Sequence, residues 1–192
     1  MTIYTSVIAA SWLAFMLVWT VTAFSAKPSA NAGRTWWGWG ASRLGIVALV
    51  LLALRVPALH HDLRAIQPAW VVSNPDLGIL GAALCVAGVG LAVWARLILG
   101  RNWGMPMTRK QNPELITAGP YGVIRHPIYT GMLIAMLGSM LGGSTLVSLP
   151  LVIVGGYFIY SARREEKLML EQFPTVYPAY MKRTKMLLPF IF

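Results

Sequence analysis

The chain has 192 residues, of which 57% are apolar and only 11% are Asp, Glu, Lys or Arg. Soluble domains carry about 25% charged residues, so this composition excludes an ordinary soluble protein and favours one embedded in a membrane. The net charge of +10 does not indicate nucleic-acid binding, because no basic helix interleaved with aromatic residues is present. We expect membrane lipids as neighbours and no nucleic-acid partner.

Three apolar segments are long enough to cross a bilayer, since a ~30 Å hydrocarbon core requires about 20 residues of helix. They are residues 3–24, 41–59 and 77–99. A longer apolar stretch at 130–161 is interrupted by Gly142-Gly143-Ser144 and also contains Pro150. Both features break or start helices, so we predict a tight hairpin of two helices there.

The predicted fold is therefore an all-α integral membrane protein with five transmembrane helices, the last two forming a tight hairpin. This count places 14 of the 16 lysines and arginines on one side of the membrane, whereas four crossings would separate the basic tail from the basic third loop. Basic loops favour the cytoplasmic face. We expect an integral membrane protein with its N-terminus outside and its C-terminus in the cytoplasm.

Several features of the first half have structural interpretations. Trp12 and Trp19, like the tryptophans at 36, 37 and 39, are predicted to form interfacial belts. Four glycines in the third span predict close helix packing instead of a dinucleotide-binding loop, which would need a strand, a turn and a helix; they are Gly78, Gly81, Gly88 and Gly90.

No metal site is expected. His60-His61-Asp62 contains metal-ligating residue types, but neighbouring residues on a helix point about 100° apart and no third ligand is near in sequence. Cys85 is the single cysteine, which excludes a disulfide framework and a cysteine-based metal centre.

The second half of the chain has a different character. A junction rich in Arg, Gly, Asn and Pro follows residue 95, and a further helix with a mixed apolar face is predicted over 165–180, lying in the membrane interface. The apolar tail 187–192 is expected to pack against the body. We treat residues 1–192 as one membrane domain, with 1–93 as scaffold helices and 94–192 as the catalytic region.

The most unusual segment lies between Gly119 and Gly131 and reads Gly-Pro-Tyr-Gly-Val-Ile-Arg-His-Pro-Ile-Tyr-Thr-Gly. Arg125 offers a planar fork for a carboxylate or phosphate, and Tyr121 and Tyr129 offer flat faces with polar tips. Glu165 and Glu166 can accept hydrogen bonds from an ammonium or from ribose hydroxyls. Together they predict a site for a small zwitterionic or cationic molecule that carries an aromatic ring.

A purely structural interpretation competes with this one. Arg125 and His126 are also typical of basic residues at the cytoplasmic start of a helix, with Pro127 in its first turn. Glu165 and Glu166 are then surface partners of the neighbouring arginines. The functional interpretation is favoured because polar side chains are costly beside hydrocarbon and are usually retained there for binding or chemistry.

The motifs resemble the isoprenylcysteine carboxyl methyltransferase family, which is related to phospholipid N-methyltransferases and more distantly to membrane sterol reductases. The resemblance covers residues 94–189 and depends on Leu99-Gly100-x-x-Trp103, Gly119-Pro120-Tyr121-x-x-x-Arg125-His126-Pro127-x-Tyr129-x-Gly131, Glu165-Glu166 with Phe173, and Tyr177-x-x-Tyr180. These motifs are specific for the superfamily and carry little information about the substrate.

The resemblance implies a cytosol-facing pocket for S-adenosylmethionine between the last two helices and the segment after them. Glu166, Arg163 and Arg164 are the candidate catalytic residues, the arginines lying at the substrate end. The candidate cofactor-binding residues are Tyr121, Arg125, His126, Pro127, Tyr129, Gly131, Glu165 and Glu166.

The predicted activity is methyl transfer from S-adenosylmethionine to a lipophilic acceptor that enters from the bilayer. A carboxylate or thiolate acceptor needs no strong base, whereas a phenol or an amine would need Glu166 or His126 to remove its proton. The alternatives are a phospholipid N-methyltransferase, an NADPH-dependent reductase of the sterol-reductase type, and a non-enzymatic membrane assembly factor.

Overall fold

The computed structural model describes residues 2–23, 74–103, 114–142 and 148–188. These residues form helices and irregular segments with no β-strand: α1 (Ile3–Ala23), α5 (Pro75–Leu99), α6 (Pro127–Leu141), α7 (Ser148–Gln172) and α8 (Tyr177–Arg183), with short 3-10 turns η1 (Gly100–Asn102) and η2 (Gly119–Gly122). The predicted span at 41–59, the tryptophans at 36, 37 and 39, and His60-His61-Asp62 lie outside the described residues.

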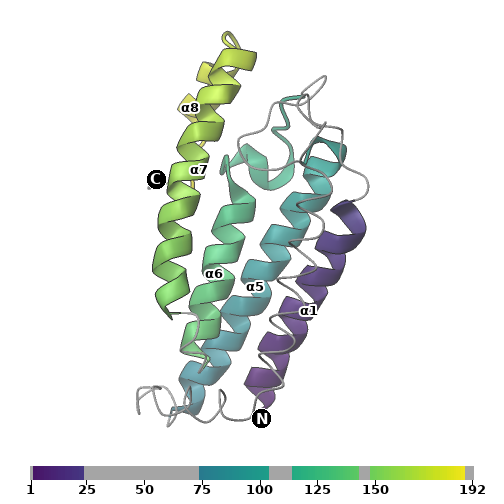
Figure 1. Ribbon diagram of the computed structural model, residues 1–192, viewed down its shortest axis with the longest axis vertical. Helices are drawn as coiled ribbons and strands as arrows, with labels where there is room; N and C mark the ends of the chain where they lie inside the picture. The colour runs from purple at the N-terminus through teal and green to yellow at the C-terminus, as the bar shows by residue number, and fades with distance from the viewer. Residues whose placement is uncertain (1, 24–73, 104–113, 143–147, 189–192) are drawn as a thin grey trace, which may run out of the picture.

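The four long helices run side by side (Figure 1). α1, α5 and α7 point in one direction and α6 in the other, so the C-terminal ends of three helices meet the start of α6 at the upper end of the figure. Residues 3–22 and 75–102 are long and apolar enough to cross a membrane, and residues 127–141 form a shorter apolar helix. The predicted helices at 3–24 and 77–99 are therefore confirmed, and the five-span count stays a prediction.

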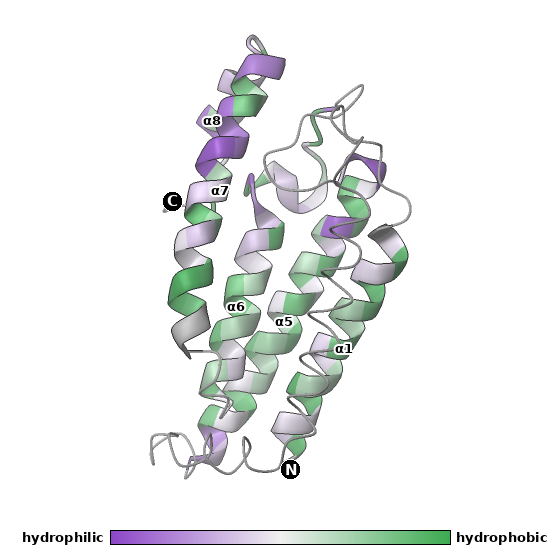
Figure 2. Cartoon of the chain, viewed as in Figure 1, coloured by the Kyte–Doolittle hydropathy of each residue, from purple (hydrophilic) through white to green (hydrophobic). Residues whose placement is uncertain are grey.

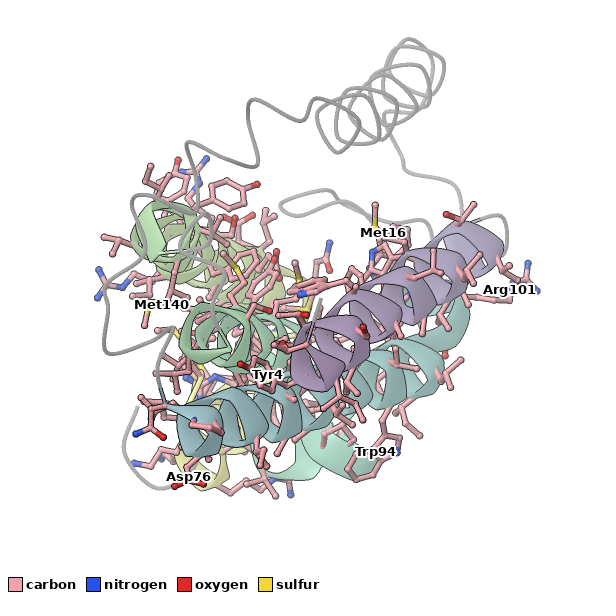
Figure 3. The ribbon with its side chains drawn as sticks, turned by 90° about the horizontal axis from the view of Figure 1, so that it is seen from below. Tyr4, Met16, Asp76, Trp94, Arg101 and Met140 are labelled. Carbon is pink, nitrogen blue, oxygen red and sulfur yellow. The ribbon has the colours of Figure 1, made fainter. Side chains whose placement is uncertain are left out.

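Helix α5 has clear start and stop signals. The Asn74 side chain accepts a hydrogen bond from the Asp76 N–H at 3.0 Å, and Pro75 occupies the first turn, where its missing N–H costs nothing. Gly100 ends the helix with a φ of 52°, a conformation that glycine adopts without strain. Trp94 lies on the outer side of the helix and points away from the bundle (Figure 3).

α5 and α6 pack through a seam of small residues. The seam positions on α5 are Gly81, Cys85, Gly88 and Ala92, and those facing them are Gly131, Ala135 and Gly138 on α6 with Gly142 at its C-cap. A Cβ atom at Gly81 would lie 2.4 Å from the Gly142 amide nitrogen, and one at Gly88 would lie 2.4 Å from that of Ala135. The two backbones are therefore in direct contact, which confirms the predicted close packing for Gly81 and Gly88.

Trp12 does not belong to an interfacial belt. Its indole N–H donates to the Ser139 hydroxyl on α6 at 2.9 Å, and its ring packs with Trp19 against a buried cluster that includes Ile8, Phe15 and Cys85. The belt prediction is wrong for Trp12 because an indole N–H inside a bundle can be satisfied by a neighbouring helix as well as by water.

Arg96 ties the ends of two helices together. It is 1% exposed and donates to the Thr22 carbonyl at 2.5 Å and to the Gly100 carbonyl at 2.9 Å, with its guanidinium 4.5 Å from the centre of the Trp103 ring. These carbonyls lie at the C-terminal ends of α1 and α5, where the helix dipoles place partial negative charge. This explains how a buried cation is held without a carboxylate partner among the described residues.

The last helices differ from the prediction. α6 ends at Leu141 and α7 begins at Ser148, which confirms the break at Gly142 and the start near Pro150. The separate helix predicted over 165–180 is wrong, because α7 continues to Gln172 and α8 covers only Tyr177–Arg183. Residues 162–172 are strong helix formers that extend α7, and Pro174 then ends it. Hydrophilic residues gather on this upper end of α7 and on α8 (Figure 2).

Candidate active site

The segment that precedes α6 is fixed by backbone pairing with a distant part of the chain. Arg125 N–H donates to the Lys185 carbonyl at 2.8 Å, and His126 N–H donates to that of Met186 at 3.1 Å. In return, Lys185 N–H donates to the Val123 carbonyl at 3.1 Å, which makes a short parallel pairing around Ile124. The orientation of Arg125 and His126 therefore depends on residues sixty positions later.

A second anchor holds the η2 turn. The Tyr180 hydroxyl on α8 donates to the Tyr121 carbonyl at 2.7 Å, and both rings are buried. The Thr130 hydroxyl in the first turn of α6 also donates to the Leu187 carbonyl at 2.6 Å. These contacts confirm that the start of the predicted apolar tail, at residue 187, packs against the body, whereas residues 189–192 lie outside the described residues.

Arg125 and Glu166 form a buried ion pair between the start of α6 and α7. The Arg125 Nε donates to Glu166 Oε1 at 2.5 Å, and both side chains are about one-tenth exposed. Nη1 of Arg125 donates to the Thr184 carbonyl at 2.5 Å and to the Met181 carbonyl at 3.3 Å. The guanidinium thus connects α7 with the segment that follows α8.

His126 lies between two carboxylates. Its Nδ1 is 3.5 Å from Glu165 Oε2, and its Nε2 is 3.5 Å from Glu166 Oε1. The Tyr129 hydroxyl donates to Glu165 Oε1, so each carboxylate is also held by a second donor. The aromatic rings of His126, Tyr129 and Phe158 form a column, with centroid separations of 5.5 Å and 4.5 Å and nearly parallel planes.

The electrostatics of this cluster favour its ionised form. Burial alone would lower the pKa of His126, but the facing carboxylates of Glu165 and Glu166 outweigh burial and raise that pKa above its ordinary value. Burial would raise the pKa of Glu166, but hydrogen bonds and positive charge from His126 and Arg125 lower it. Both groups lie at the polar end of the molecule, outside the apolar spans, and both shifts favour the charged form.

This arrangement predicts how stability depends on pH. Because the folded-state pKa of His126 is raised, its stabilising contribution is complete below the unfolded value of 6.5, declines as pH rises and is lost above the folded-state pKa. Glu166 contributes fully above 4.5 and loses its contribution as pH falls through its lowered pKa. Thermal unfolding in detergent from pH 5 to 9 should show the alkaline decline in the wild type and not in His126→Gln. Parallel profiles would contradict the assignment.

The structure brings together most of the predicted site residues. Arg125, His126, Tyr129, Glu165 and Glu166 make direct contacts, and Tyr121 joins the site through its backbone carbonyl. Pro127 occupies the first turn of α6, as predicted.

Gly131 and the two arginines lie apart from this cluster. A Cβ atom at Gly131 would lie 2.5 Å from the Gly88 carbonyl oxygen, so helix packing accounts for this glycine. Arg163 and Arg164 are exposed, and within the described ranges neither pairs with Glu165 or Glu166. The ligand role of Gly131 and the catalytic role of the arginines stay predictions.

Sequence reasoning missed several residues that shape the site. Phe158 and Ser161 precede Glu165 by seven and four positions on one side of α7, so helical spacing alone was enough to find them. Thr184 and Met181 contribute backbone carbonyls to Arg125, and no local pattern in the sequence indicates such contacts. Within the described ranges, no group of three or more His, Cys, Asp or Glu side chains is arranged to hold a metal ion.

Comparison with known families places this geometry in context. The sequence model described as phospholipid methyltransferase matches residues 77–176, more than half of the chain. The chain belongs to the phospholipid methyltransferase family. The matched region contains nearly all of α5, the whole of α6 and α7, and the whole Arg125 to Glu166 cluster, and it ends before the tail segment that pairs with His126.

Individual relatives support the predicted resemblance. The chain is 28% identical to methanethiol S-methyltransferase of Pseudomonas sp. (strain GM41(2012)), with 88% of this chain and 70% of the relative covered. It is 25% identical to protein-S-isoprenylcysteine O-methyltransferase B of Arabidopsis thaliana, with 79% and 82% covered. It is also 28% identical to the cobalt-zinc-cadmium resistance protein CzcN of Cupriavidus metallidurans, with 75% of this chain and 60% of that protein covered.

The fold is shared with a solved membrane enzyme. The structure of the eukaryotic intramembrane Ras methyltransferase ICMT superposes with a TM-score of 0.63 at 19% identity, covering 98% of this chain and 65% of that chain. The chain thus spans about two thirds of the length of ICMT and 60% of CzcN. The expected likeness to isoprenylcysteine methyltransferases is confirmed at the level of family and fold.

Proposed function

We propose that this chain is a membrane methyltransferase that uses S-adenosylmethionine to methylate a lipophilic acceptor entering from the bilayer. The observation that carries the proposal is the buried cluster of Arg125, His126, Glu165 and Glu166 at one end of an apolar helical bundle. Burying charged side chains costs free energy, and such clusters are usually retained where they bind or react with a ligand. Membership of a phospholipid methyltransferase family supports methyl transfer as that function.

The residues present fit the methyl donor. Glu165 and Glu166 offer carboxylate oxygens to its ammonium or ribose hydroxyls, Arg125 offers a cation to its carboxylate, and the Tyr129–Phe158 stack offers an apolar face to its adenine. Nε2 of His126 is buried and has only a long approach of 3.5 Å to Glu166 Oε1, so this donor is weakly held and is available to a ligand. When bound, the donor supplies a methyl group on a positively charged sulfur, so the protein mainly has to align the reactants and exclude water.

The pKa shifts of Glu166 and His126 bear on whether the site can remove a proton from the methyl acceptor. Glu166 is held by Arg125, and its lowered pKa makes it a poor proton acceptor. Glu165 and Glu166 outweigh burial and raise the pKa of His126, which favours its protonated form, a proton donor instead of a base. We therefore propose an acceptor that arrives as an anion, such as a carboxylate or a thiolate, in preference to a phenol or an amine. The exposed Arg163 or Arg164 would pair with it.

The orientation proposed for the chain follows the distribution of basic residues. The C-terminal part of α7, which carries Arg163 and Arg164, and α8, which carries Lys182 and Arg183, form the hydrophilic end of the molecule (Figure 2). We propose that this end faces the cytoplasm, where S-adenosylmethionine is made, and that the N-terminus lies outside. An inner or plasma membrane of a prokaryote is the proposed location.

Binding of S-adenosylhomocysteine, measured by isothermal titration in detergent, tests the donor assignment. We expect the wild type to bind and Tyr129→Phe to bind about tenfold more weakly, because losing one hydrogen bond to a charged partner costs about 1.5–3 kcal/mol. The variant keeps the ring stack with Phe158 and loses only the bond to Glu165. Tyr160→Phe is the matched control, because Tyr160 is exposed on the same helix.

Failure of folded wild-type protein to bind S-adenosylhomocysteine would contradict the methyltransferase proposal, and binding of NADPH in its place would favour a reductase. Equal affinity of Tyr129→Phe and the wild type would contradict the site. Mass spectrometry of membrane lipids from cells with and without the gene should reveal the acceptor as a species that differs by one methyl group.

A further inference from the structure

Ser161 is a buried polar residue to which the contacts described so far assign no role. It lies on α7 with no solvent exposure, and its hydroxyl makes no hydrogen bond. A buried hydroxyl without a partner costs about 1–3 kcal/mol relative to one that is satisfied. This cost calls for an explanation, because a serine in a helix has a partner within easy reach.

The partner that Ser161 leaves unused is a carbonyl of the preceding turn of its own helix. Serine and threonine in helices commonly donate to the carbonyl three or four positions earlier. All the other α-helical serine and threonine hydroxyls with described side chains make this bond, namely Thr5, Ser6, Ser11, Thr20, Thr22, Thr130 and Ser139. Ser161 is the exception within this set.

The position of Ser161 places it in the candidate active site. It lies three residues after Phe158 and four before Glu165, which puts all three on one side of α7. The phenol of Tyr129, which donates to Glu165, lies beside the Ser161 hydroxyl at a geometry that falls short of a hydrogen bond. A second buried atom in the same group of residues lacks a hydrogen bond of normal geometry, namely Nε2 of His126, which faces Glu166 Oε1 at 3.5 Å. Two such weakly held polar atoms in one cluster leave room for a further polar partner.

We propose that Ser161 is a ligand-contacting residue, whose hydroxyl is kept free of its own helix in order to bond a polar group of the methyl donor. This proposal rests on the function proposed above. A hydroxyl can both donate and accept, and together with the carboxylate one turn later it suits a donor hydroxyl or ammonium group. Because water does not reach either free atom, side chains over the cluster have to move before a ligand makes these contacts.

Two alanine variants test the proposal. Ser161→Ala should bind S-adenosylhomocysteine about five- to tenfold more weakly than the wild type, as expected for one lost hydrogen bond. Its melting temperature should be unchanged or higher, because the variant removes an unsatisfied buried hydroxyl. Ser139→Ala is the matched control: this serine is equally buried, but its hydroxyl accepts from Trp12 and donates to the Ala135 carbonyl.

The control should show the opposite pattern, with a lower melting temperature and unchanged affinity for S-adenosylhomocysteine. Ser161→Cys should follow Ser161→Ala and provides the same measurement if the alanine variant does not fold. Unchanged affinity in Ser161→Ala, with a wild type that binds, would overturn the role of Ser161 and leave the methyltransferase proposal standing. Absence of binding by the folded wild type would overturn both.

Discussion

Replacing Glu166 by alanine is expected to cost about 3–5 kcal/mol of unfolding free energy and to abolish binding of S-adenosylhomocysteine. The carboxylate accepts from Arg125 and faces His126, and all three side chains are about nine-tenths buried. Without it, two positive charges remain inside the protein with only Glu165 to balance them. Thermal unfolding and isothermal titration in the same detergent would measure the two effects.

Glu171→Ala is the control for Glu166→Ala. Glu171 lies on the same helix but is exposed, so its removal should change stability by less than about 1 kcal/mol. Glu166→Gln should be intermediate, because the amide oxygen still accepts from Arg125 without supplying a charge. If Glu166→Ala and Glu171→Ala were equally stable, the buried ion pair would not be a major element of the site.

Adding one methyl group at Gly88 is expected to destabilise the bundle by about 3 kcal/mol and to weaken ligand binding at a distance. A Cβ atom there would lie 2.4 Å from the Ala135 amide nitrogen and 2.5 Å from the Gly131 carbonyl oxygen. These are backbone atoms, so only a separation of α5 and α6 relieves the overlap. Since α6 begins beside His126, its displacement disturbs the cluster as well.

Gly90→Ala provides the control for this experiment. Gly90 lies on the same helix two residues later, and no atom lies within 4 Å of the position of its Cβ. Alanine is about 1 kcal/mol more favourable than glycine inside a helix, so this variant should be as stable as the wild type or slightly more so. Equal melting temperatures for Gly88→Ala and Gly90→Ala would show that the two helices are not in backbone contact.

Much of the fold was predictable because its signals are local. The length of apolar runs predicted α1 and α5 to within a few residues, and Gly142 correctly marked the end of α6. The error over 165–180 arose from treating a change of polarity as a helix boundary. A charged sequence such as 162–172 continues a helix as readily as an apolar one, because Ala, Arg, Glu, Lys, Leu, Met and Gln are all strong helix formers.

The site was predicted less completely, for a physical reason. The residue types in the motif between Gly119 and Gly131, with Glu165 and Glu166, indicated a binding site, and the structure brings five of them into contact. Which glutamate pairs with which cation was not predicted, because the sequence alone allows Glu165 or Glu166 to pair with either Arg125 or His126. Backbone carbonyls that bind Arg125 are invisible to any pattern of side chains.

The pairing of residues 123–126 with 185–186 also sets an order of events during synthesis. Arg125 leaves the ribosome 59 residues before Thr184, whose carbonyl holds its guanidinium. All of α1, α5 and α6 are therefore synthesised before Arg125 and His126 can meet their backbone partners. This end of the molecule is completed last, so a chain that stops after α7 lacks the carbonyls that hold Arg125 and His126 in place.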